Sequence, residues 1–486
     1  MSNTINTLEP KAMWSNFAAL NAVPRASKKE ERVIAFVQDF GKSLSLETIT
    51  DEIGNVIIKK PATAGMDNRQ TIVMQSHLDM VHQKNADTDF DFDTEGIKML
   101  IEGDWVRADG TTLGADNGIG VATIMAILAS KDIAHPAIEA LFTIDEETGM
   151  TGALGLKGGL LTGTILLNLD TEDDRELTIG CAGGVDITAT GMYREVEVPD
   201  GYNTYRLRVK GLTGGHSGMD IHLGRGNANK LINRLLAKIA KELKPLVTTI
   251  DGGGLRNAIP RESQIILSVP SKEQEKLKTI VEAYKAIFQA EYGTTDPDID
   301  LTIEPEAKAT RAAAPDFTLL LLQSTYACPN GIYRMSPDID DLVQTSNNLA
   351  RVLLKAGRYE ILCLTRSSVD TEKDDLEMAI RSTFELMGAQ VTNAGAYPGW
   401  APKPSAPIIK LMSQTYERLY NEKPHVNACH AGLECGIIGT NYPDMDMISF
   451  GPNIRGAHSP DEKVQISSVQ KYWGYLLEVL KAIPEK

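Results

Sequence analysis

The chain has 486 residues, of which 42% are hydrophobic and 23% are charged. A chain of this length and composition can bury a sizeable core, so disorder and a small disulfide-stapled scaffold are excluded, and two domains are expected. The formal net charge is −16, from 65 acidic and 49 basic side chains. An acidic surface repels phosphate backbones and anionic lipid, so neither nucleic acid nor a membrane is expected as a partner.

The cysteines and the N-terminal segment predict a cytoplasmic protein. The five cysteines contain no CxxC pair, which argues against a disulfide framework and favours a reducing compartment. The first residues, MSNTINTLEPKAMW, lack a basic stretch followed by an apolar one. No segment reaches the ~18 apolar residues that a membrane span needs.

The first third of the chain alternates helices with apolar strands. Amphipathic helices are expected at Trp14–Val23 and Glu30–Leu44, followed by a hairpin over residues 46–59. Three apolar runs then read as strands, with a helix at Ile119–Leu128 between the first two: Thr71–Gln75, Ile138–Ile144 and Thr164–Leu169. This alternation predicts an α/β layer with a parallel or mixed sheet.

From about Val185 the pattern changes to longer alternating strands with two long helices. The expected strands are Thr204–Leu212, Gln264–Val269, Asp341–Leu354 and Tyr359–Thr365, and the helices are Asn227–Leu243 and Lys272–Tyr292. The run Leu319–Leu322 is expected to be a buried helix face. After the Gly/Pro-rich residues 394–407, an α/β pattern returns with Ile408–Tyr420, Met445–Phe450 and Ser467–Ile483. We therefore predict a two-domain α/β fold, with a mixed-sheet domain from residues 1–186 and 400–486 and an inserted α+β domain over 187–399.

Three of the apolar strands end in residues that can bind a metal ion, namely His77, Glu147 and Asp170. In open α/β sheets ligands collect at the carboxyl ends of strands. A glycine-rich turn adds Asp116 and a C-terminal loop adds His458. Each has an ordinary alternative, such as a helix cap, a solvated acidic loop or a surface histidine. Together, two histidines and three carboxylates suit two Zn²⁺ or similar ions that share a carboxylate.

Several motifs together resemble the aminoacyl-histidine dipeptidases, a carnosine-cleaving branch of the zinc metallopeptidases that also includes peptidase T. They are SHLDMV, TTLGADNGIG, DEETGM, NLD, GCAGG, GLTGGHSG, GGLRNAIPRE, AYPGW, HAGLECG and GPNIRGAHSPDE. The resemblance implies that His77 and Asp170 bind one metal, that Glu147 and His458 bind the other, and that Asp116 bridges both. It further implies that Asp79 orients His77, that Glu146 is the general base, and that the Asp116–Asn117 peptide is cis.

The resemblance also implies residues of the inserted domain, which would be a lid and dimerisation domain over a zinc-aminopeptidase-like catalytic domain. His216 is expected to stabilise the oxyanion from a second subunit, although it could be a turn histidine. Candidate substrate contacts, each with a structural alternative, are Asn257, Arg366, His430 and Glu434, of which the last two are expected to meet near the start of a short helix. The role of His82 stays open.

The resulting expectation is a cytoplasmic homodimer that hydrolyses Xaa-His dipeptides, such as carnosine, and other short unblocked peptides. A hydroxide that bridges two divalent ions, expected to be zinc with cobalt or manganese as alternatives, would attack the peptide carbonyl while Glu146 takes up the proton. Two alternatives are an amino-acid deacylase or a peptidase of other specificity on the same fold, and a non-catalytic metal- or peptide-binding protein.

Overall fold

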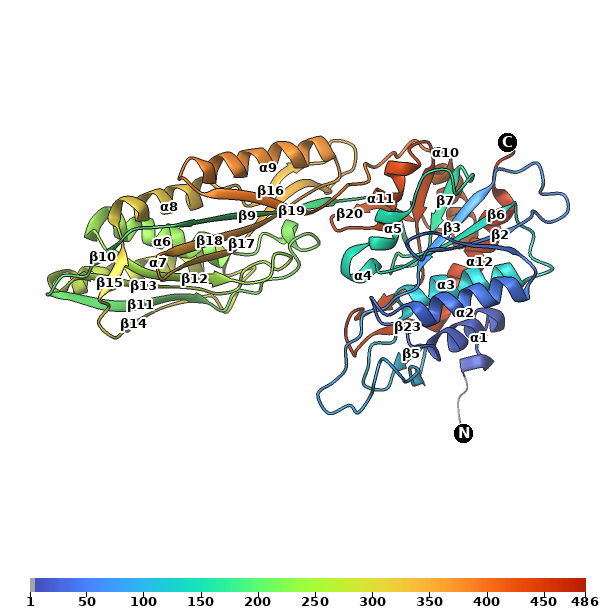
Figure 1. Cartoon of the computed structure of the whole chain (residues 1–486), viewed down its shortest axis with the longest axis horizontal. Coiled ribbons are helices and arrows are strands. Elements are labelled where there is room, and N and C mark those ends of the chain that lie inside the picture. The colour runs from blue at the N-terminus through green and yellow to red at the C-terminus, as the bar shows by residue number, and fades with distance from the viewer. Residues whose placement is uncertain (1–4) are drawn as a thin grey trace. The chain divides into compact units, whose positions relative to one another are not determined.

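The structure is a computed structural model that describes residues 5–486, and it divides into two compact units (Figure 1). The first unit comprises the chain up to Gly180 together with Trp400–Ala428 and Leu433–Lys486. The second unit comprises Cys181–Gly399 and the tetrapeptide Cys429–Gly432. The sequence prediction had placed the divisions at 186/187 and 399/400, without the tetrapeptide.

The first unit is built on a mixed eight-stranded sheet in the order β1-β2-β6-β3-β7-β21-β8-β20. Strand β3 runs parallel to both β6 and β7, and β7 runs parallel to β21. The three central strands are fully buried runs rich in Ile, Leu and Val, as expected for parallel strands covered on both faces. The strand bounds are β1 Glu47–Thr50, β2 Val56–Lys60, β3 Ile72–His77, β6 Ile138–Thr143, β7 Ile165–Asn168, β8 Glu176–Cys181, β20 His425–Cys429 and β21 Asp446–Ser449.

Helix α3 (Ala115–Ala129) connects the sheet to the N-terminal helix of this unit, because it packs against both β3 and α1 (Lys11–Asn21). It is apolar and buried on nearly every side, and it starts four residues before the predicted Ile119. A small second sheet has the order β22-β23-β5-β4, with bounds Ile454–Arg455, Lys463–Gln465, Trp105–Ala108 and Met99–Glu102. The other helices are α2 Glu31–Ser43, α4 Glu146–Gly149, α5 Thr151–Gly155, α10 Pro407–Tyr420, α11 Glu434–Asn441 and α12 Ile466–Ala482.

The second unit is built on a nine-stranded antiparallel sheet. Its order is β14-β11-β13-β12-β17-β18-β9-β19, with β16 paired to β17 as well. The four strands predicted in this region and the two predicted long helices have bounds within about two residues of those observed. The strands are β9 Gly183–Met192, β11 Tyr202–Lys210, β12 Leu246–Gly253, β13 Ser263–Pro270, β14 Asp300–Pro305, β16 Gly331–Met335, β17 Val343–Lys355, β18 Arg358–Ser367 and β19 Gln390–Tyr397. A separate pair joins β10 Glu195–Glu197 to β15 Arg311–Ala313.

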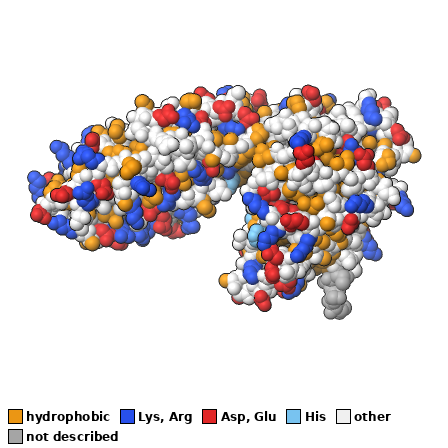
Figure 2. All heavy atoms as spheres, in the orientation of Figure 1, with side chains coloured by type: hydrophobic (Ala, Val, Ile, Leu, Met, Phe, Trp, Pro, Cys, Tyr) orange, Lys and Arg blue, Asp and Glu red, His pale blue; other side chains and the backbone are white. Residues whose placement is uncertain are grey.

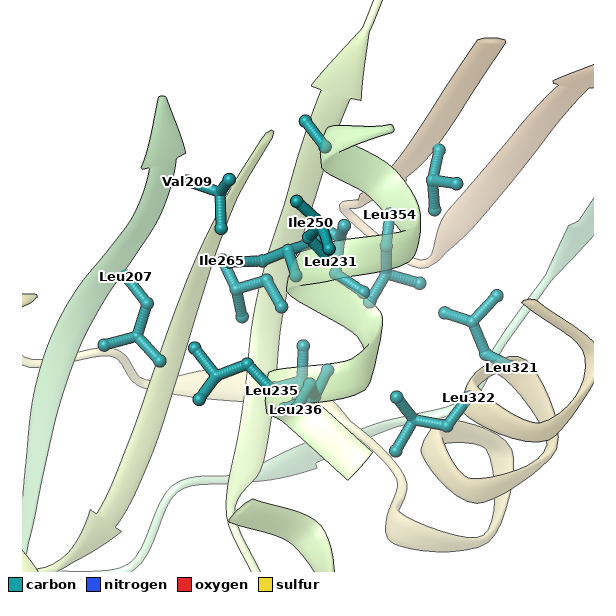
Figure 3. Packing of buried hydrophobic residues seen from close by; sticks show 14 of the residues in the cluster. Leu207, Val209, Leu231, Leu235, Leu236, Ile250, Ile265, Leu321, Leu322 and Leu354 are labelled. Atoms are coloured by element: carbon teal, nitrogen blue, oxygen red, sulfur yellow. The ribbon is translucent and has the colours of Figure 1, made fainter. Parts of the chain in front are cut away.

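Four helices cover one face of this sheet and share one hydrophobic core with it (Figure 3). They are α6 Ala228–Leu243, α7 Gln274–Tyr292, α8 Pro315–Ala327 and α9 Asp370–Glu385. Alternate residues of β11, Tyr205, Leu207 and Val209, point into this core, as the period of two in a strand requires. The prediction that Leu319–Leu322 form a buried helix face is correct for Leu321 and Leu322, which are buried. It is wrong for Leu319 and Leu320, which are exposed because they lie on the other side of α8.

The surface carries charged side chains of both signs, as the composition of the chain leads us to expect. Acidic and basic side chains are interspersed over the face of each unit that Figure 2 shows. Over residues 5–486, no helix is long and apolar enough to cross a lipid bilayer. The start of the N-terminal segment, residues 1–4, lies outside the described residues.

Candidate metal centre

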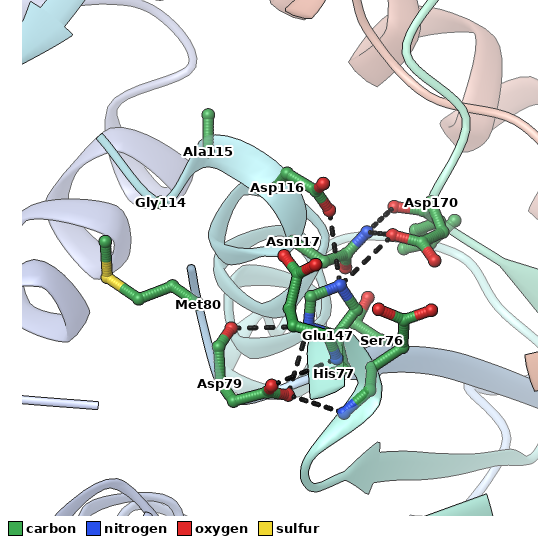
Figure 4. Close-up of polar contacts among 12 residues, drawn as sticks. Ser76, His77, Asp79, Met80, Gly114, Ala115, Asp116, Asn117, Glu147 and Asp170 are labelled. Atoms are coloured by element: carbon green, nitrogen blue, oxygen red, sulfur yellow. Dashed lines mark hydrogen bonds and ion pairs between the residues drawn. The ribbon is translucent and has the colours of Figure 1, made fainter. Parts of the chain in front are cut away.

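The carboxyl ends of three parallel strands bring the predicted ligands to one edge of the first sheet (Figure 4). His77 is the last residue of β3, Glu147 follows β6 in the short helix α4, and Asp170 follows β7. The other two predicted ligands come from outside these strands: Asp116 is the second residue of α3, and His458 lies in the loop between β22 and β23. The Asp116–Asn117 peptide is cis, as the resemblance implied.

The five side chains form two groups that share Asp116. His77 Nε2 lies 3.2 Å from Asp116 Oδ1 and 3.5 Å from Asp170 Oδ1. His458 Nε2 lies 3.2 Å from Asp116 Oδ2 and 3.0 Å from Glu147 Oε2. Each oxygen of Asp116 therefore serves a different group, which is the arrangement of a carboxylate that bridges two ions.

The charges and unpaired atoms of the cluster also fit cations. Hydrogen bonds to Asp116 and Glu147 raise the pKa of His458 to about 11. Burial lowers the pKa of His77, but Asp170 and Asp116 outweigh it and raise that pKa well above its usual value. Glu147 Oε1 is buried without a hydrogen-bond partner. Surroundings that favour a positive imidazolium this strongly equally favour divalent cations, and histidine with carboxylate is a common zinc donor set.

Asp79 fixes the orientation of His77. The imidazole Nδ1 lies 3.2 Å from the Asp79 backbone oxygen and 3.3 Å from Oδ1, so Nδ1 donates and the Nε2 lone pair faces the cluster. The Asp79 carboxylate also accepts hydrogen bonds from the backbone N–H groups of Glu146 and Glu147, at 3.0 and 3.2 Å. One buried carboxylate thus positions both the histidine and the first turn of α4.

Glu146 lies beside this cluster. One oxygen of Glu146 lies within 4.8 Å of ligand atoms of His77 and Glu147. Burial raises the pKa of Glu146 well above its ordinary value, and the charges of Asp170 and Glu147 add to this effect. A carboxyl group whose pKa is shifted towards neutrality can accept a proton and return it, which a general base must do.

A second group of predicted residues gathers in the second unit around the loop that carries His216. The His216 Nδ1 accepts hydrogen bonds from the N–H groups of Gly218 (3.2 Å) and Met219 (3.0 Å). Because burial and then the nearby Arg366 lower the pKa of His216 to about 4, the ring is neutral and carries its proton on Nε2. His216 is therefore a hydrogen-bond donor at Nε2.

Arg366 and His430 lie against the same loop. Arg366 is buried, donates from Nη1 to Tyr397 Oη at 2.8 Å, and has an Nε without a partner. His430 bonds Ser346 Oγ at 2.7 Å, and burial followed by the charge of Arg366 lowers the pKa of His430 to about 3. Asn257 is exposed, and its backbone oxygen accepts from the Ser217 N–H at 2.8 Å. This group presents donors and one buried cation, and so suits an anion.

Glu434 and His82 lie in different surroundings from each other. Glu434 is fully buried in the first unit, where its Oε2 accepts from Gln75 Nε2 and Thr143 Oγ1, both at 2.6 Å. Burial raises its pKa to about 8. His82 is exposed and packs edge-on against Phe92, with ring centroids 5.9 Å apart.

Three residues that lie around the metal centre were not predicted from the sequence motifs. Asn117 donates from Nδ2 to Asp170 Oδ1 and to the Leu169 carbonyl, so it orients a predicted ligand. Glu462 and Arg25 hold the turn before Asp116 through hydrogen bonds to its backbone. Asn117 and Glu462 stand inside the quoted segments TTLGADNGIG and GPNIRGAHSPDE, but Arg25 has no such signal because it acts on residues distant in sequence.

Comparison with known proteins agrees with this site. The family model described as "Peptidase family M20/M25/M40" matches residues 73–482. The chain is 44% identical over 485 residues, 99% of each chain, to the cytosol non-specific dipeptidase of Escherichia coli. The structure of aminoacylhistidine dipeptidase from Vibrio alginolyticus superposes with a TM-score of 0.94 at 45% identity, covering 100% of this chain and 99% of that one. The aminopeptidase PepT of Bacillus cereus shares the fold, at 16% identity and a TM-score of 0.57 over 98% and 99% of the two chains.

The fold and the cluster define a metal-dependent hydrolase that acts on peptide bonds. The chain belongs to peptidase family M20/M25/M40. The predicted two-domain fold with mixed α/β sheets is confirmed. The names of the two similar proteins also agree with the predicted resemblance to dipeptidases.

Proposed function

We propose that this chain is a dipeptidase that hydrolyses Xaa-His and other short unblocked peptides with two divalent metal ions. The observation that carries the proposal is the pair of ligand groups that share the two oxygens of Asp116. The names of the similar proteins, a non-specific dipeptidase and an aminoacylhistidine dipeptidase, support a dipeptide substrate. No observation favours a deacylase or a non-catalytic binder.

The residues that would hold the ions are His77 and Asp170 for one, Glu147 and His458 for the other, and Asp116 for both. We propose zinc, with cobalt or manganese as alternatives, because two imidazoles and three carboxylates suit all three. When bound, such a pair of ions lowers the pKa of a shared water towards ~7 and polarises the peptide carbonyl.

Glu146 would move the proton of the reaction. Its carboxylate takes a proton from the attacking water and then gives it to the leaving amine nitrogen, so one residue serves both steps. The raised pKa of Glu146, caused first by burial, supports this double role. Asp79 would hold His77 and the first turn of α4, and so keep Glu146 in reach of the water.

The second unit would act as a lid that binds the carboxylate end of the substrate. His216 would donate from Nε2 to the developing oxyanion, and Arg366 would pair with the terminal carboxylate. Asn257 and His430 would line this subsite. Glu434 would support the substrate pocket through its hydrogen bonds to Thr143 and Gln75. Closure of the lid would exclude water and complete the site.

We further propose that the protein is a cytoplasmic homodimer in which His216 reaches the metal centre of the second subunit. The homodimer rests on the family resemblance, and the location is supported by the word "cytosol" in the name of the similar Escherichia coli protein. The family resemblance also supports this origin of His216. Because His216, Arg366 and His430 belong to one unit of the chain, the same subunit would supply all three.

A panel of dipeptides tests the function directly. The protein is treated with a chelator, single divalent ions are added back, and the hydrolysis of Xaa-His, other dipeptides and N-acylated amino acids is measured. We expect no activity without metal and cleavage of free dipeptides after zinc, cobalt or manganese is restored. Faster cleavage of N-acyl amino acids than of any dipeptide would contradict the proposal.

Glu146→Gln tests the proposed base. The variant should still bind two ions, because the amide leaves all five ligands in place, but its turnover should fall at least about 10²-fold, the scale of general-base catalysis. Metal content and kcat are measured on the same preparation. Unchanged turnover would remove Glu146 from the mechanism.

A further inference from the structure

The turn that delivers Asp116 lacks a cap of its own. The N-cap residue of α3 is Gly114, which has no side chain to accept a hydrogen bond and adopts a left-handed conformation with φ 68°. The backbone N–H groups at the start of a helix have no partner within the helix. In this turn they include those of Ala115 and Asp116, the second of which is the proposed bridging ligand, and the N–H groups of Leu113 and Gly114 come directly before them.

A single distant carboxylate satisfies all four of these N–H groups. Glu462 Oε2 accepts from Leu113 N at 2.7 Å and from Gly114 N at 2.9 Å, and Glu462 Oε1 accepts from Ala115 N at 2.7 Å and from Asp116 N at 3.2 Å. The side chain is 2% exposed. A buried carboxylate on the N–H groups of a helix start is stabilised by charge-assisted hydrogen bonds and by the helix dipole.

Glu462 also belongs to the loop that carries His458. It lies four residues after this proposed ligand, and its own N–H donates to the Ser459 backbone oxygen at 3.0 Å. The His458 residue has a positive φ of 64°, a conformation that a non-glycine residue keeps only when its surroundings hold it. The Glu462 carboxylate therefore joins the loop of one proposed ligand to the turn of another.

Arg25 makes the corresponding link to the third ligand segment. This fully buried guanidinium donates to the Gly114 carbonyl oxygen at 2.6 Å and to the Leu78 and Asp79 carbonyl oxygens at 3.1 and 3.0 Å. The last two follow directly on His77. Burial lowers the pKa of Arg25 to about 10, and the charge of Glu462 opposes this shift more strongly than that of any other group.

We propose that Glu462 and Arg25 are positioning residues that hold the His77, Asp116 and His458 segments at the spacing that two metal ions need. Neither side chain is among the proposed ligands, and the inference rests on the metal-binding function proposed above. A carboxylate that only capped α3 would contribute to stability alone. A positioning residue contributes to metal affinity as well, since removal of a group that orients ligands typically weakens metal binding by about 10–100-fold.

The test compares Glu462→Gln with Glu139→Gln by metal titration of the chelator-treated full chain. Glutamine at 462 keeps the shape but turns an amide NH₂ towards backbone N–H groups, so part of the turn loses its acceptor. Glu139 is a matched control: it is also buried, and its carboxylate accepts from the N–H groups of Thr162 and Gly163 at 2.7 and 3.0 Å. The loop it holds carries none of the proposed ligands.

We expect zinc affinity to fall at least tenfold in Glu462→Gln and to stay at the wild-type value in Glu139→Gln. Both substitutions are expected to lower the unfolding temperature. Wild-type affinity in Glu462→Gln, or an equal loss in both variants, would overturn the inference. If Glu462→Gln does not fold, Arg25→Lys is titrated in its place, with the same expectation and the same contrary result. A wild-type chain that binds no ion would overturn the proposed function, and the inference with it.

Discussion

Asp116 offers a different carboxylate oxygen to each histidine of the metal centre, so its loss should not be equivalent to the loss of any other ligand. We predict that Asp116→Ala impairs the binding of both ions, whereas His458→Ala impairs chiefly one, because His458 belongs to one group only. Metal content per chain, measured after dialysis against limiting zinc, distinguishes the two variants. An Asp116→Ala chain that retains two ions would refute the bridging assignment.

His430 should make the folded state sensitive to acid. Burial, and after it the charge of Arg366, lowers the pKa of His430 from 6.5 to about 3. The unfolded chain therefore binds a proton below pH 6.5 that the folded chain does not bind. As a result, the free energy of unfolding decreases as the pH is lowered. Between pH 7.5 and 5 the wild type should lose up to about 2 kcal/mol more than His430→Asn.

Urea unfolding at the two pH values, with chelator present in both, measures this difference. Other titrating groups cancel in the comparison because both proteins carry them. An equal loss of stability in the two proteins would mean that His430 is protonated in the folded state.

At the residue scale, the proposed ligands could be predicted from the sequence, whereas the residues that we propose position them could not. His77, Glu147 and Asp170 could be predicted because each follows an apolar strand, and parallel strands end at one edge of a sheet. Glu462 and Arg25 could not be predicted in this way, because they bind backbone groups of segments that are distant in the sequence. A buried carboxylate that caps a distant turn carries no local pattern.

At the scale of elements, the long helices and the apolar strands were predicted, whereas most short and polar strands were not, and two of the errors on helices have clear physical causes. The start of α3 was missed because residues 114–118, Gly-Ala-Asp-Asn-Gly, carry no apolar helical period. Asp116 and Asn117 also have non-helical backbone angles inside the element. On α8 the four consecutive leucines were read as one buried face. A helix turns 100° per residue, so four neighbours cannot all face the core.

Close packing of α3 on the strands gives a prediction for Gly120. A Cβ added there would lie 2.3 Å from Asn117 Oδ1, 2.4 Å from Ser76 Oγ and 2.8 Å from the Leu169 carbonyl oxygen. Gly120→Ala should therefore destabilise the protein by about 1–3 kcal/mol, the usual cost of overpacking. Urea denaturation provides the measurement.

Gly474 in α12 is the matched control, because a Cβ added there meets no atom within 4 Å. Gly474→Ala should stabilise the protein by about 0.5–1 kcal/mol through the higher helix propensity of alanine. Equal effects of the two substitutions would show that helix propensity alone, and not contact with the strands, governs Gly120.

At the scale of the whole molecule, the origin of His216 can be tested by mixing two inactive chains. Glu146→Gln lacks the proposed base, and His216→Ala lacks the proposed oxyanion donor. If His216 comes from the partner, as we propose, about a quarter of the sites are intact in random dimers. If each chain used its own His216, co-expression of the two variants would restore no activity, because every site would retain one defect. Activity of the co-purified mixture decides between the two.

The chain passes between the two units four times, at 180/181, 399/400, 428/429 and 432/433. During synthesis, a nascent polypeptide released as far as Gly399 already contains every strand of the large antiparallel sheet but still lacks His430. His430, which we propose lines the subsite for the substrate carboxylate, is added only after about thirty more codons have been translated. An expression fragment that stops at Gly399 would therefore contain the whole sheet but lack His430, and a fragment that covers the complete second unit also needs the tetrapeptide Cys429–Gly432.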